Sequence, residues 1–245
     1  MTAPPRWWDG PLLAFDLETT GVDVETARIV TASAVMTAPD GTVLRSRTWL
    51  ADPGVEIPAE ATAIHKVTTE MARAHGRPAP EVADQLAAVL GVEWARGVPV
   101  IAMNIGYDLT VLLRELARHR LGRLSVGPCL DPYVIDRAMD VYRKGSRRLD
   151  ALAAHYRVTL DDAHNSAADA LAAVSVVRRQ LDKEWYGSAL RAMSLAELQT
   201  WQASQHAARQ ASFQDYLRTK ADPPQPDAVI DGHWPFRPAR SEATA

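Results

Sequence analysis

The order of apolar segments along the chain most constrains its fold. Three strand-like runs follow one another at residues 11–17, 27–37 and 42–50, and Pro39, Asp40 and Gly41 between the last two are typical of a hairpin turn. Shorter apolar runs at 98–103 and 127–131 alternate instead with segments of helical spacing. A meander followed by strands that alternate with helices predicts an α/β fold, in which helices flank a mixed five-stranded sheet.

Helical spacing and capping residues predict the elements between these strands. We expect a short helix from Thr68 or Thr69 to about residue 74, and a second helix that Pro80 opens. Further helices are expected at 109–121, 132–141, 148–156 and 166–183, the last capped by Asn165. Residues 51–67 contain two prolines and a glycine, and we expect them to form a loop.

The composition of the chain changes after Trp185. Residues 1–185, with their core at 10–183, are expected to form one domain, and residues 186–245 an appendage. Ser194 and Glu197 form a capping signal for a helix at 194–219, and five prolines predict an extended tail over 221–245. This appendage would pack on the domain, mediate a homodimer or bind a replication or repair partner, and the sequence leaves these alternatives open.

Size, charge and cysteine content restrict the class of protein. No apolar stretch reaches the ~20 residues that span a membrane, and the first residues lack the basic and apolar regions of a signal peptide. Cys129 is the only cysteine, which excludes an intrachain disulfide, and we expect a buried thiol and a cytoplasmic protein. The formal net charge of −3 argues against a broadly basic protein that coats nucleic acid, but not against an enzyme that holds a few phosphates.

Two acidic side chains end the first apolar run. Asp16 and Glu18 are two residues apart, so in a strand they point to the same face. Two close carboxylates repel each other unless a cation lies between them, and a hard divalent ion with oxygen ligands is the natural candidate. Because the chain has 30 acidic residues in 245, the pair alone also fits a solvated strand end.

Three further residues stand at comparable places in the chain. Asp108 follows the expected strand at 98–103, and His164 and Asp169 flank the start of the helix at 166–183. Each has an ordinary alternative: Asp108 as a helix cap, Asp169 as a charge favoured by the helix dipole, and His164 as a loop histidine. Their joint occurrence in this order is much harder to assign to chance, and it predicts a cluster of four carboxylates with a histidine.

These segments resemble a known family. Asp16-Leu-Glu18-Thr-Thr-Gly, Asn104-x-x-Tyr-Asp108 and His164-x4-Asp169 match the three motifs of the DEDDh 3′–5′ exonucleases. That family includes the proofreading epsilon subunit of bacterial DNA polymerase III, and the resemblance covers about residues 10–183. It implies a ribonuclease H-like fold and two-metal hydrolysis of phosphodiester bonds.

By this resemblance, the carboxylates hold two Mg²⁺ or Mn²⁺ ions. Asp16 would bridge both ions, and Asp108 would support one of them. Glu18 and Asp169 would complete the site of the ion that holds the attacking water. His164 would be the general base that takes a proton from this water. The expected reaction releases nucleoside monophosphates from the 3′ end of single-stranded DNA.

The resemblance also implies contacts with the substrate. The backbone near Leu17 and Thr19 would hold the terminal 3′-hydroxyl group. Ile64 and His65 lie in a segment that resembles the family's Ile/Val-His-Gly-Ile-Thr loop, with Lys66 in place of the usual Gly. They would contact the base and phosphate of the terminal nucleotide. Asn104 and Tyr107 would line the same cleft, although ordinary packing is an equal alternative for Ile64 and Tyr107.

The substrate and the basic run at 143–148 leave further alternatives open. Four cations lie among the six residues from Arg143 to Arg148, and they would either contact phosphate or form a solvated loop. RNA or short oligoribonucleotides are an alternative substrate, because discrimination depends on contacts to the 2′-hydroxyl group. A non-catalytic nucleic-acid-binding module is a further alternative, which the retention of every expected carboxylate disfavours.

Overall fold

A mixed sheet of six strands organises the fold, in the order β4-β3-β2-β1-β5-β6. The structure, a computed structural model, describes residues 6–160 and 164–239. The antiparallel meander consists of β1 (Leu12–Thr19), β2 (Ile29–Thr37) and β3 (Val43–Asp52). Parallel pairing adds β5 (Val100–Ile101) next to β1, β6 (Cys129–Leu130) next to β5, and β4 (Arg77–Pro78) next to β3. The α/β class and the five expected strands are confirmed, and β4 is a sixth strand of two residues that the sequence did not predict.

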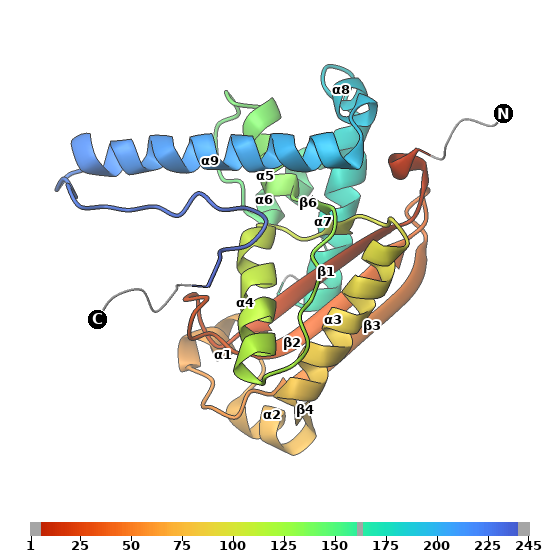
Figure 1. Ribbon diagram of the computed structural model, residues 1–245, viewed down its shortest axis with the longest axis vertical. Coiled ribbons are helices and arrows are strands. Elements are labelled where there is room, and N and C mark those ends of the chain that lie inside the picture. The colour runs from red at the N-terminus through yellow and green to blue at the C-terminus, as the bar shows by residue number, and fades with distance from the viewer. Residues whose placement is uncertain (1–5, 161–163, 240–245) are drawn as a thin grey trace.

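Helices cover both faces of this sheet (Figure 1). On one face, α3 (Ala79–Ala95) and α4 (Ile105–Arg118) pack against Leu13 and Phe15 of β1. On the other face, α7 (Ser166–Leu181) packs against Leu12 and Ala14. Because successive side chains of a strand point to opposite faces, Asp16 and Glu18 belong to the face that α7 covers. The other elements of this part are η1 (Trp7–Asp9), α1 (Ala59–His65), α2 (Thr69–His75), α5 (Pro132–Met139) and α6 (Leu149–Tyr156).

The expectation of a loop over residues 51–67 was wrong, because α1 lies within it. Ala61 of α1 is buried against Val30 and Ile57, and these contacts come from separate segments of the chain. Lys66 ends the helix in the left-handed conformation, with φ 65°, and its backbone N–H donates to the Thr62 carbonyl. Tertiary contacts therefore form a helix here that the local proline and glycine signals do not predict.

The expected bounds of the helix at 109–121 were also wrong. α4 begins at Ile105, and Asn104 precedes it in the left-handed conformation, with φ 58°. The backbone N–H groups of Asn104 and Ile105 donate to the two oxygens of Asp131, each at 3.1 Å. This remote carboxylate stabilises the start of the helix, so Asp108 lies in the first turn and is not the cap.

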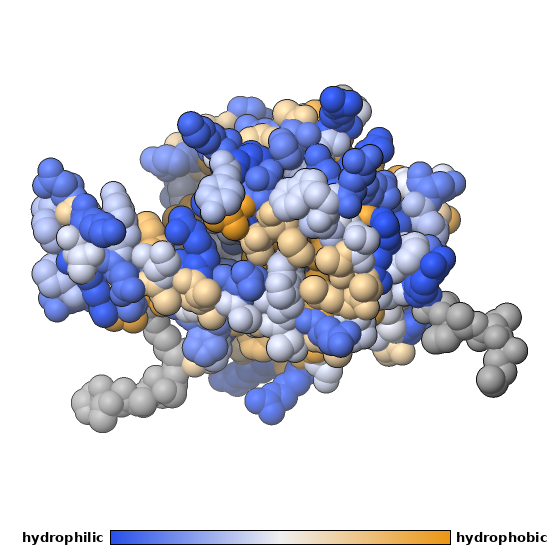
Figure 2. Space-filling model, turned by 90° about the horizontal axis from the view of Figure 1, so that it is seen from above, coloured by the Kyte–Doolittle hydropathy of each residue, from blue (hydrophilic) through white to orange (hydrophobic). Residues whose placement is uncertain are grey.

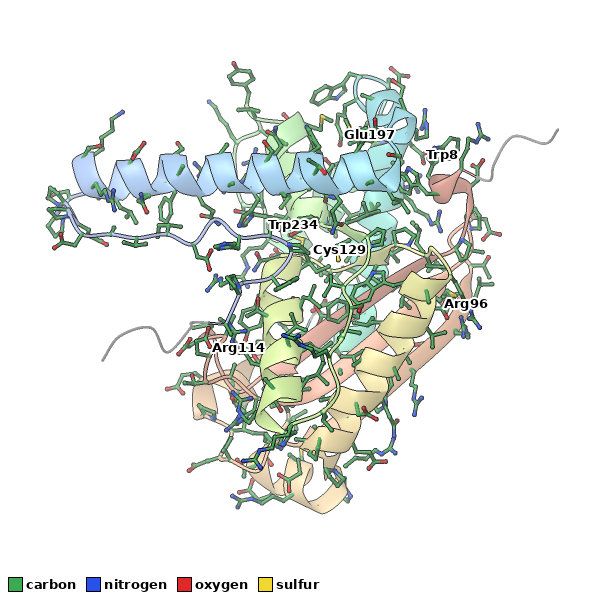
Figure 3. The ribbon with its side chains drawn as sticks, in the orientation of Figure 1. Trp8, Arg96, Arg114, Cys129, Glu197 and Trp234 are labelled. Atoms are coloured by element: carbon green, nitrogen blue, oxygen red, sulfur yellow. The ribbon has the colours of Figure 1, made fainter. Side chains whose placement is uncertain are left out.

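The segment after Trp185 forms two helices and an irregular return. The sequence did not predict α8 (Gly187–Ala192), whereas α9 (Leu195–Thr219) begins at the expected Ser194–Glu197 capping box. α9 crosses the end of the sheet above β6 and α5 (Figure 1), and residues 220–239 then return beneath it without helix or strand. Trp234 of this return is buried in the same core cluster as α4, below α9 (Figure 3). The division at residue 185 stays a prediction.

Two glutamine side chains of α9 hold the edge strand β6. Gln199 accepts a hydrogen bond from the Cys129 N–H at 2.6 Å, and Gln202 accepts one from the Asp131 N–H at 2.8 Å. Gln202 also donates to the Cys129 carbonyl at 3.0 Å. These bonds satisfy backbone groups that an edge strand would otherwise expose. Cys129 is buried and unpaired as expected, and its burial raises the pKa of the thiol.

Over the described ranges, none of the helices combines the length and the apolar character needed to cross a membrane.

Candidate active site

The first two carboxylates lie near the end of β1. Asp16 pairs with Ser33 of β2 in the sheet and Glu18 pairs with Thr31, so both have fixed backbone positions. Their side chains are half-buried, whereas Leu17 between them is buried in the opposite core. The strand therefore directs both carboxylates to one face, as the sequence predicted.

Asp108 reaches the same place from the first turn of α4. It is buried, and its Oδ1 accepts a hydrogen bond from the Leu17 backbone N–H at 3.1 Å. This bond joins α4 to β1 at the residue between Asp16 and Glu18. The junction that the sequence places after the strand at 98–103 thus brings a third carboxylate to the pair.

The start of α7 brings the remaining two residues. Asn165 caps the helix by accepting from the Ala167 N–H, as predicted, and the Asp169 side chain accepts from the His164 N–H at 3.1 Å. Ligand atoms of Glu18, His164 and Asp169 all lie within 4.8 Å of one another. His164 is exposed and in the left-handed conformation, whereas Asp169 is buried.

Hydroxyl groups fasten this end of α7 to the sheet. The Ser166 hydroxyl lies 2.7 Å from the hydroxyl of Ser33 and 3.3 Å from that of Thr31, the β2 residues opposite Asp16 and Glu18. Ser166 therefore fixes the distance between the carboxylates of β1 and the start of α7. No motif in the sequence marks these three hydroxyls, because their pairing depends on the register of β2.

Burial and mutual repulsion raise the pKa values of the clustered carboxyl groups. Burial raises the pKa of Glu18 to about 7, and the charge of Asp169 adds to this effect. The pKa of Asp16 is raised well above its usual value by burial and then by the charges of Asp108, Asp169 and Glu18. Burial also raises the pKa of Asp108, although the hydrogen bond from Leu17 lowers it.

This donor set fits divalent cations. Oxygen ligands from several carboxylates suit Mg²⁺ and Mn²⁺, and a cation among them would offset the repulsion that raises their pKa values. Because the pKa of Glu18 is about 7, binding near neutral pH would displace the proton from the fraction of Glu18 that is protonated.

The residues predicted to contact substrate lie around this cluster. Ile64 is half exposed at the end of α1, and His65 next to it is buried. Asn104 is exposed at the start of α4, beside the first turn that carries Asp108. These positions leave the side chains of Ile64 and Asn104 open to a ligand.

Tyr107 and Thr19 form a brace beside the cluster. The hydroxyl groups of Tyr107 and Thr19 lie within hydrogen-bond distance of each other and of the Gly21 carbonyl, 2.9 Å from Thr19, and their two protons make two of these three hydrogen bonds at a time. Tyr107 thereby ties α4 to the turn after β1. Burial raises the pKa of its phenol to about 12, so this group stays protonated and able to donate.

Sequence reasoning also missed Asp131, which supports the site. Its carboxylate accepts from the N–H groups of Asn104 and Ile105 and from that of Tyr133, and its burial raises its pKa to about 6. It thus holds the helix that carries Asp108, without itself lying in the predicted ligand set. The signal in the sequence is the position of Asp131 at the end of a strand parallel to the one before Asn104, because such ends meet at one sheet edge.

The basic run at 143–148 divides into two kinds of residue. Arg143 and Arg147 both bind the buried carboxylate of Asp136, at 2.9 and 2.8 Å. Tyr156 also donates to Asp136, at 2.8 Å. Two of the four cations therefore fasten the loop to α5 and α6, and the expectation of phosphate contact is left to Lys144 and Arg148, which are exposed.

A family model described as an exonuclease, RNase_T, matches residues 13–177. Among curated proteins, the chain is 27% identical over 158 residues to a DNA polymerase III PolC-type protein of Lacticaseibacillus paracasei. The alignment covers 64% of this chain and 10% of the polymerase, so the chain spans about a tenth of that relative's length.

Solved structures of exonuclease I share the fold. A zinc-bound complex of the E. coli enzyme with single-stranded DNA aligns with a TM-score of 0.62 and 19% identity, over 71% of this chain and 41% of the other. Exonuclease I from Methylocaldum szegediense aligns with a TM-score of 0.63 and 22% identity, over 81% of this chain and 45% of the other. The predicted ribonuclease H-like fold is confirmed.

Proposed function

Because the chain belongs to the exonuclease family, we propose that it is a metal-dependent 3′–5′ exonuclease that shortens single-stranded DNA. The observation that carries the proposal is the convergence of Asp16, Glu18, Asp108, His164 and Asp169 from β1, α4 and α7. The similarity to a DNA polymerase and to a DNA-bound exonuclease I supports DNA over RNA as the substrate.

Asp16, Glu18, Asp108 and Asp169 would hold two Mg²⁺ or Mn²⁺ ions. When bound, the ions supply charge for the attacking water and for the leaving 3′-oxygen of an in-line displacement. The chain contributes by holding the four carboxylates at fixed positions, through the β1–β2 register, the Asp108–Leu17 hydrogen bond and the Ser166 hydroxyl. Fixed ligands lower the reorganisation that the reaction requires.

His164 would act as the general base. The residue is exposed beside Glu18 and Asp169, where the imidazole would take a proton from the attacking water. The Asp169 carboxylate accepts from the His164 backbone N–H, which places the residue relative to the helix while leaving the ring free to move. A neutral imidazole nitrogen accepts a proton from water and later releases it, which suits transfer of one proton per cycle.

His65 would contact the base and phosphate region of the terminal nucleotide. Its Nδ1 accepts a hydrogen bond from the Val67 N–H at 3.2 Å, which leaves the proton on Nε2. Nε2 is buried beside the backbone of Thr19, at the turn that follows the carboxylate pair. Ile64, exposed on the same helix end, would contact the base, and the backbone of Leu17 and Thr19 the 3′-hydroxyl group.

The test is digestion of a 5′-labelled DNA oligonucleotide with Mg²⁺ or Mn²⁺, compared with an RNA of the same sequence. We expect stepwise shortening of the DNA from its 3′ end, and none with Asp16→Asn. His164→Gln should lower kcat by about 10²–10⁴-fold and leave oligonucleotide binding in EDTA unchanged. Faster digestion of the RNA would transfer the proposal to RNA, and binding without any shortening would indicate a non-catalytic module.

The cytoplasmic location and any homodimer or replication partner stay predictions.

A further inference from the structure

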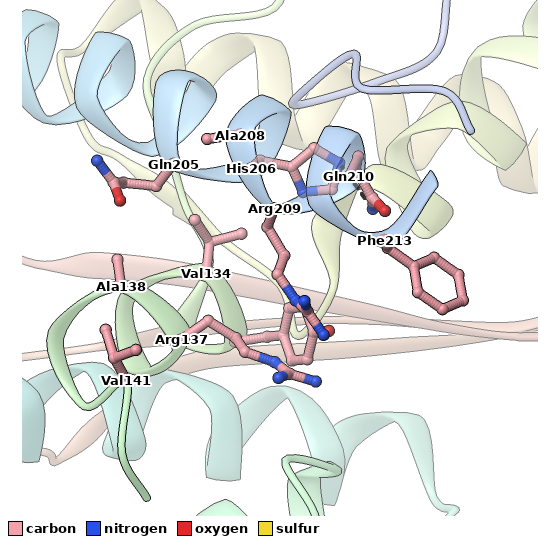
Figure 4. A pocket seen from close by; sticks show the side chains of 11 residues that line it. Val134, Arg137, Ala138, Val141, Gln205, His206, Ala208, Arg209, Gln210 and Phe213 are labelled. Atoms are coloured by element: carbon pink, nitrogen blue, oxygen red, sulfur yellow. Dashed lines mark hydrogen bonds between the residues drawn. The ribbon is translucent and has the colours of Figure 1, made fainter. Parts of the chain in front are cut away.

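A groove separates α5 from the outer half of α9. It has a volume of about 410 Å³, and we call it the α5–α9 groove. The side chains that matter to the argument are Tyr133, Arg137 and Val141 on one side and His206, Arg209 and Phe213 on the other. Arg137 and Arg209 point from the two helices into the space between them (Figure 4).

This groove continues in both directions along the surface. Tyr133 and Arg137 also line a second hollow, which extends to Arg148 and to Asn104 at the start of α4. Arg209 and Phe213 also line a third hollow, which extends along α9 to Lys220. Seen from above, hydrophilic side chains gather on the projecting end of α9, and the surface is hollowed next to it (Figure 2). A path of adjoining hollows therefore leads from Asn104, at the start of the helix that carries Asp108, to the end of α9.

Cations along this path are free of ion pairs within residues 6–160 and 164–239. They are Arg137, Arg148, Arg209 and Lys220, in contrast to Arg143 and Arg147, which Asp136 neutralises. No carboxylate lines the α5–α9 groove or the hollow that leads to Asn104, and Asp215 is the one acid that lines the outer hollow among the described residues. The path is thus positively charged on a chain whose net charge is −3.

Aromatic rings lie next to the cations of this path. The Nε of Arg137 is buried and has no hydrogen-bond partner within the described part of the chain, and its guanidinium lies 5.4 Å from the centre of the Tyr133 ring. The rings of Phe213 and Tyr216 are nearly parallel, at 12°, with centres 6.5 Å apart, and both are exposed. Exposed rings next to unpaired cations are the combination that binds single-stranded nucleic acid, because bases stack on the rings while the cations hold the phosphates.

We propose that the α5–α9 groove and the hollows at its two ends bind the part of a single strand that lies 5′ to the nucleotide in the active site. The proposal rests on the proposed function, because the direction of the path assumes that the 3′ end lies at the carboxylates. From Gln205 of α9 to Lys220 at its C-terminal cap, the sixteen residues span fifteen helical steps, or about 22 Å. At about 3.4 Å per stacked nucleotide, this length accommodates about six nucleotides.

Binding in EDTA tests the path without any turnover. A 5′-fluorescent DNA dodecanucleotide and a dinucleotide are titrated with the full chain, and anisotropy is measured over a range of salt concentrations. Arg209→Gln and Phe213→Ala change exposed residues of α9, so they should leave the fold intact, and circular dichroism checks this. Arg179→Gln on α7 and Trp185→Ala after it are matched controls, because both residues are exposed and lie outside the path.

We expect the double variant Arg209→Gln, Phe213→Ala to bind the dodecanucleotide about tenfold more weakly, with stacking and phosphate contact both contributing. The slope of log K against log salt should become shallower by about 0.7 for the lost arginine. Adding Arg137→Gln to the double variant should reduce the magnitude of this slope by a further ~0.7. The ratio of dodecanucleotide to dinucleotide affinity should fall with these variants and stay constant in both controls.

Unchanged dodecanucleotide affinity and salt slope in the double variant would overturn the proposal, and so would equal losses in the controls. Hydrolysis of the dinucleotide with Mg²⁺ separates this outcome from a failure of the proposed function. If the wild type binds the dodecanucleotide through the groove but hydrolyses neither substrate, the exonuclease assignment fails and the binding path stands. If the wild type hydrolyses both substrates while the variants bind the dodecanucleotide normally, the exonuclease assignment stands and the binding path fails.

Discussion

Replacing Glu18 by glutamine should stabilise the metal-free protein. Burial and the charge of Asp169 raise the pKa of Glu18 to about 7, which means that the folded state disfavours the ionised carboxylate. Glutamine has nearly the same shape and carries no charge. The substitution therefore removes the repulsion while preserving the packing around residue 18.

The sign of the effect follows from the protons bound in each state. Below pH 4.5, the ordinary pKa of glutamate, Glu18 keeps its proton in both the folded and the unfolded chain. The wild type and Glu18→Gln should therefore differ little in free energy of unfolding. Between 4.5 and about 7 only the unfolded chain ionises, and the free energy of unfolding of the wild type falls as the pH rises. Above about 7 both states are ionised and the full penalty on the folded state is present.

The raised pKa also gives the magnitude. A shift from 4.5 to about 7 corresponds to roughly 3 kcal/mol at about 1.4 kcal/mol per pH unit. Glu18 is partly exposed, so solvent screening reduces this to about 1–2 kcal/mol. For a chain of 245 residues, each kcal/mol changes Tm by about 2–4 °C, and Glu18→Gln should raise it by about 3–6 °C near pH 8. Near pH 5 about a quarter of this gain should remain.

The assay is thermal unfolding in EDTA at the two pH values, followed by circular dichroism. Glu184→Gln is the matched control, because Glu184 is exposed between α7 and α8, and its Tm should equal that of the wild type at both pH values. Mg²⁺ should raise the Tm of the wild type more than that of Glu18→Gln, since only the wild type keeps all the ligands. An equal or lower Tm of Glu18→Gln in EDTA near pH 8, or an equal gain at both pH values, would refute the reasoning.

Two further substitutions test how the site and the tail are held. Asp131→Asn should lower the free energy of unfolding by about 1–3 kcal/mol, and with it both Tm and the rate of hydrolysis. The reason is that an amide presents an NH₂ group to one of the two N–H donors at the start of α4. A Tm equal to that of the wild type would contradict this role of Asp131. Trp234→Ala should lower the free energy of unfolding by up to about 3–5 kcal/mol, because Trp234 is buried in the core cluster of α4. It should also make the chain after α9 more sensitive to limited proteolysis. An unchanged cleavage pattern would show that other contacts hold the tail.

Local signals were sufficient for the parts of the site that depend on one element. The spacing of Asp16 and Glu18 in an apolar run predicted that both share a face, and the β1 register agrees. Asn165 was recognised as the cap of α7, and this fixed Asp169 within the first turn of that helix. Strand alternation and helix capping depend on neighbours in the sequence, so the sequence contains the necessary information.

Long-range contacts account for the structural features that sequence patterns do not predict. α4 begins early because Asp131, on another strand, accepts its first N–H groups. In the sequence, Arg143 and Arg147 belong to a basic run that suggests phosphate binding, but the structure pairs both with Asp136. Nothing in the sequence distinguishes this buried aspartate from one on the surface. In each case the deciding partner is set by the packing of separate elements, which periodicity and capping rules do not encode.

A series of hydrogen bonds connects the C-terminal helix to the candidate active site. Gln202 of α9 accepts from the backbone N–H of Asp131, and the side chain of Asp131 holds the first N–H groups of α4. Asp108, one turn later, accepts from Leu17 between the two carboxylates of β1. Because these hydrogen bonds are consecutive, the position of α9 is fixed relative to the carboxylates. A strand lying along α9 would therefore approach the cleft from a defined direction, which is the condition for one groove to deliver successive 3′ ends to one site.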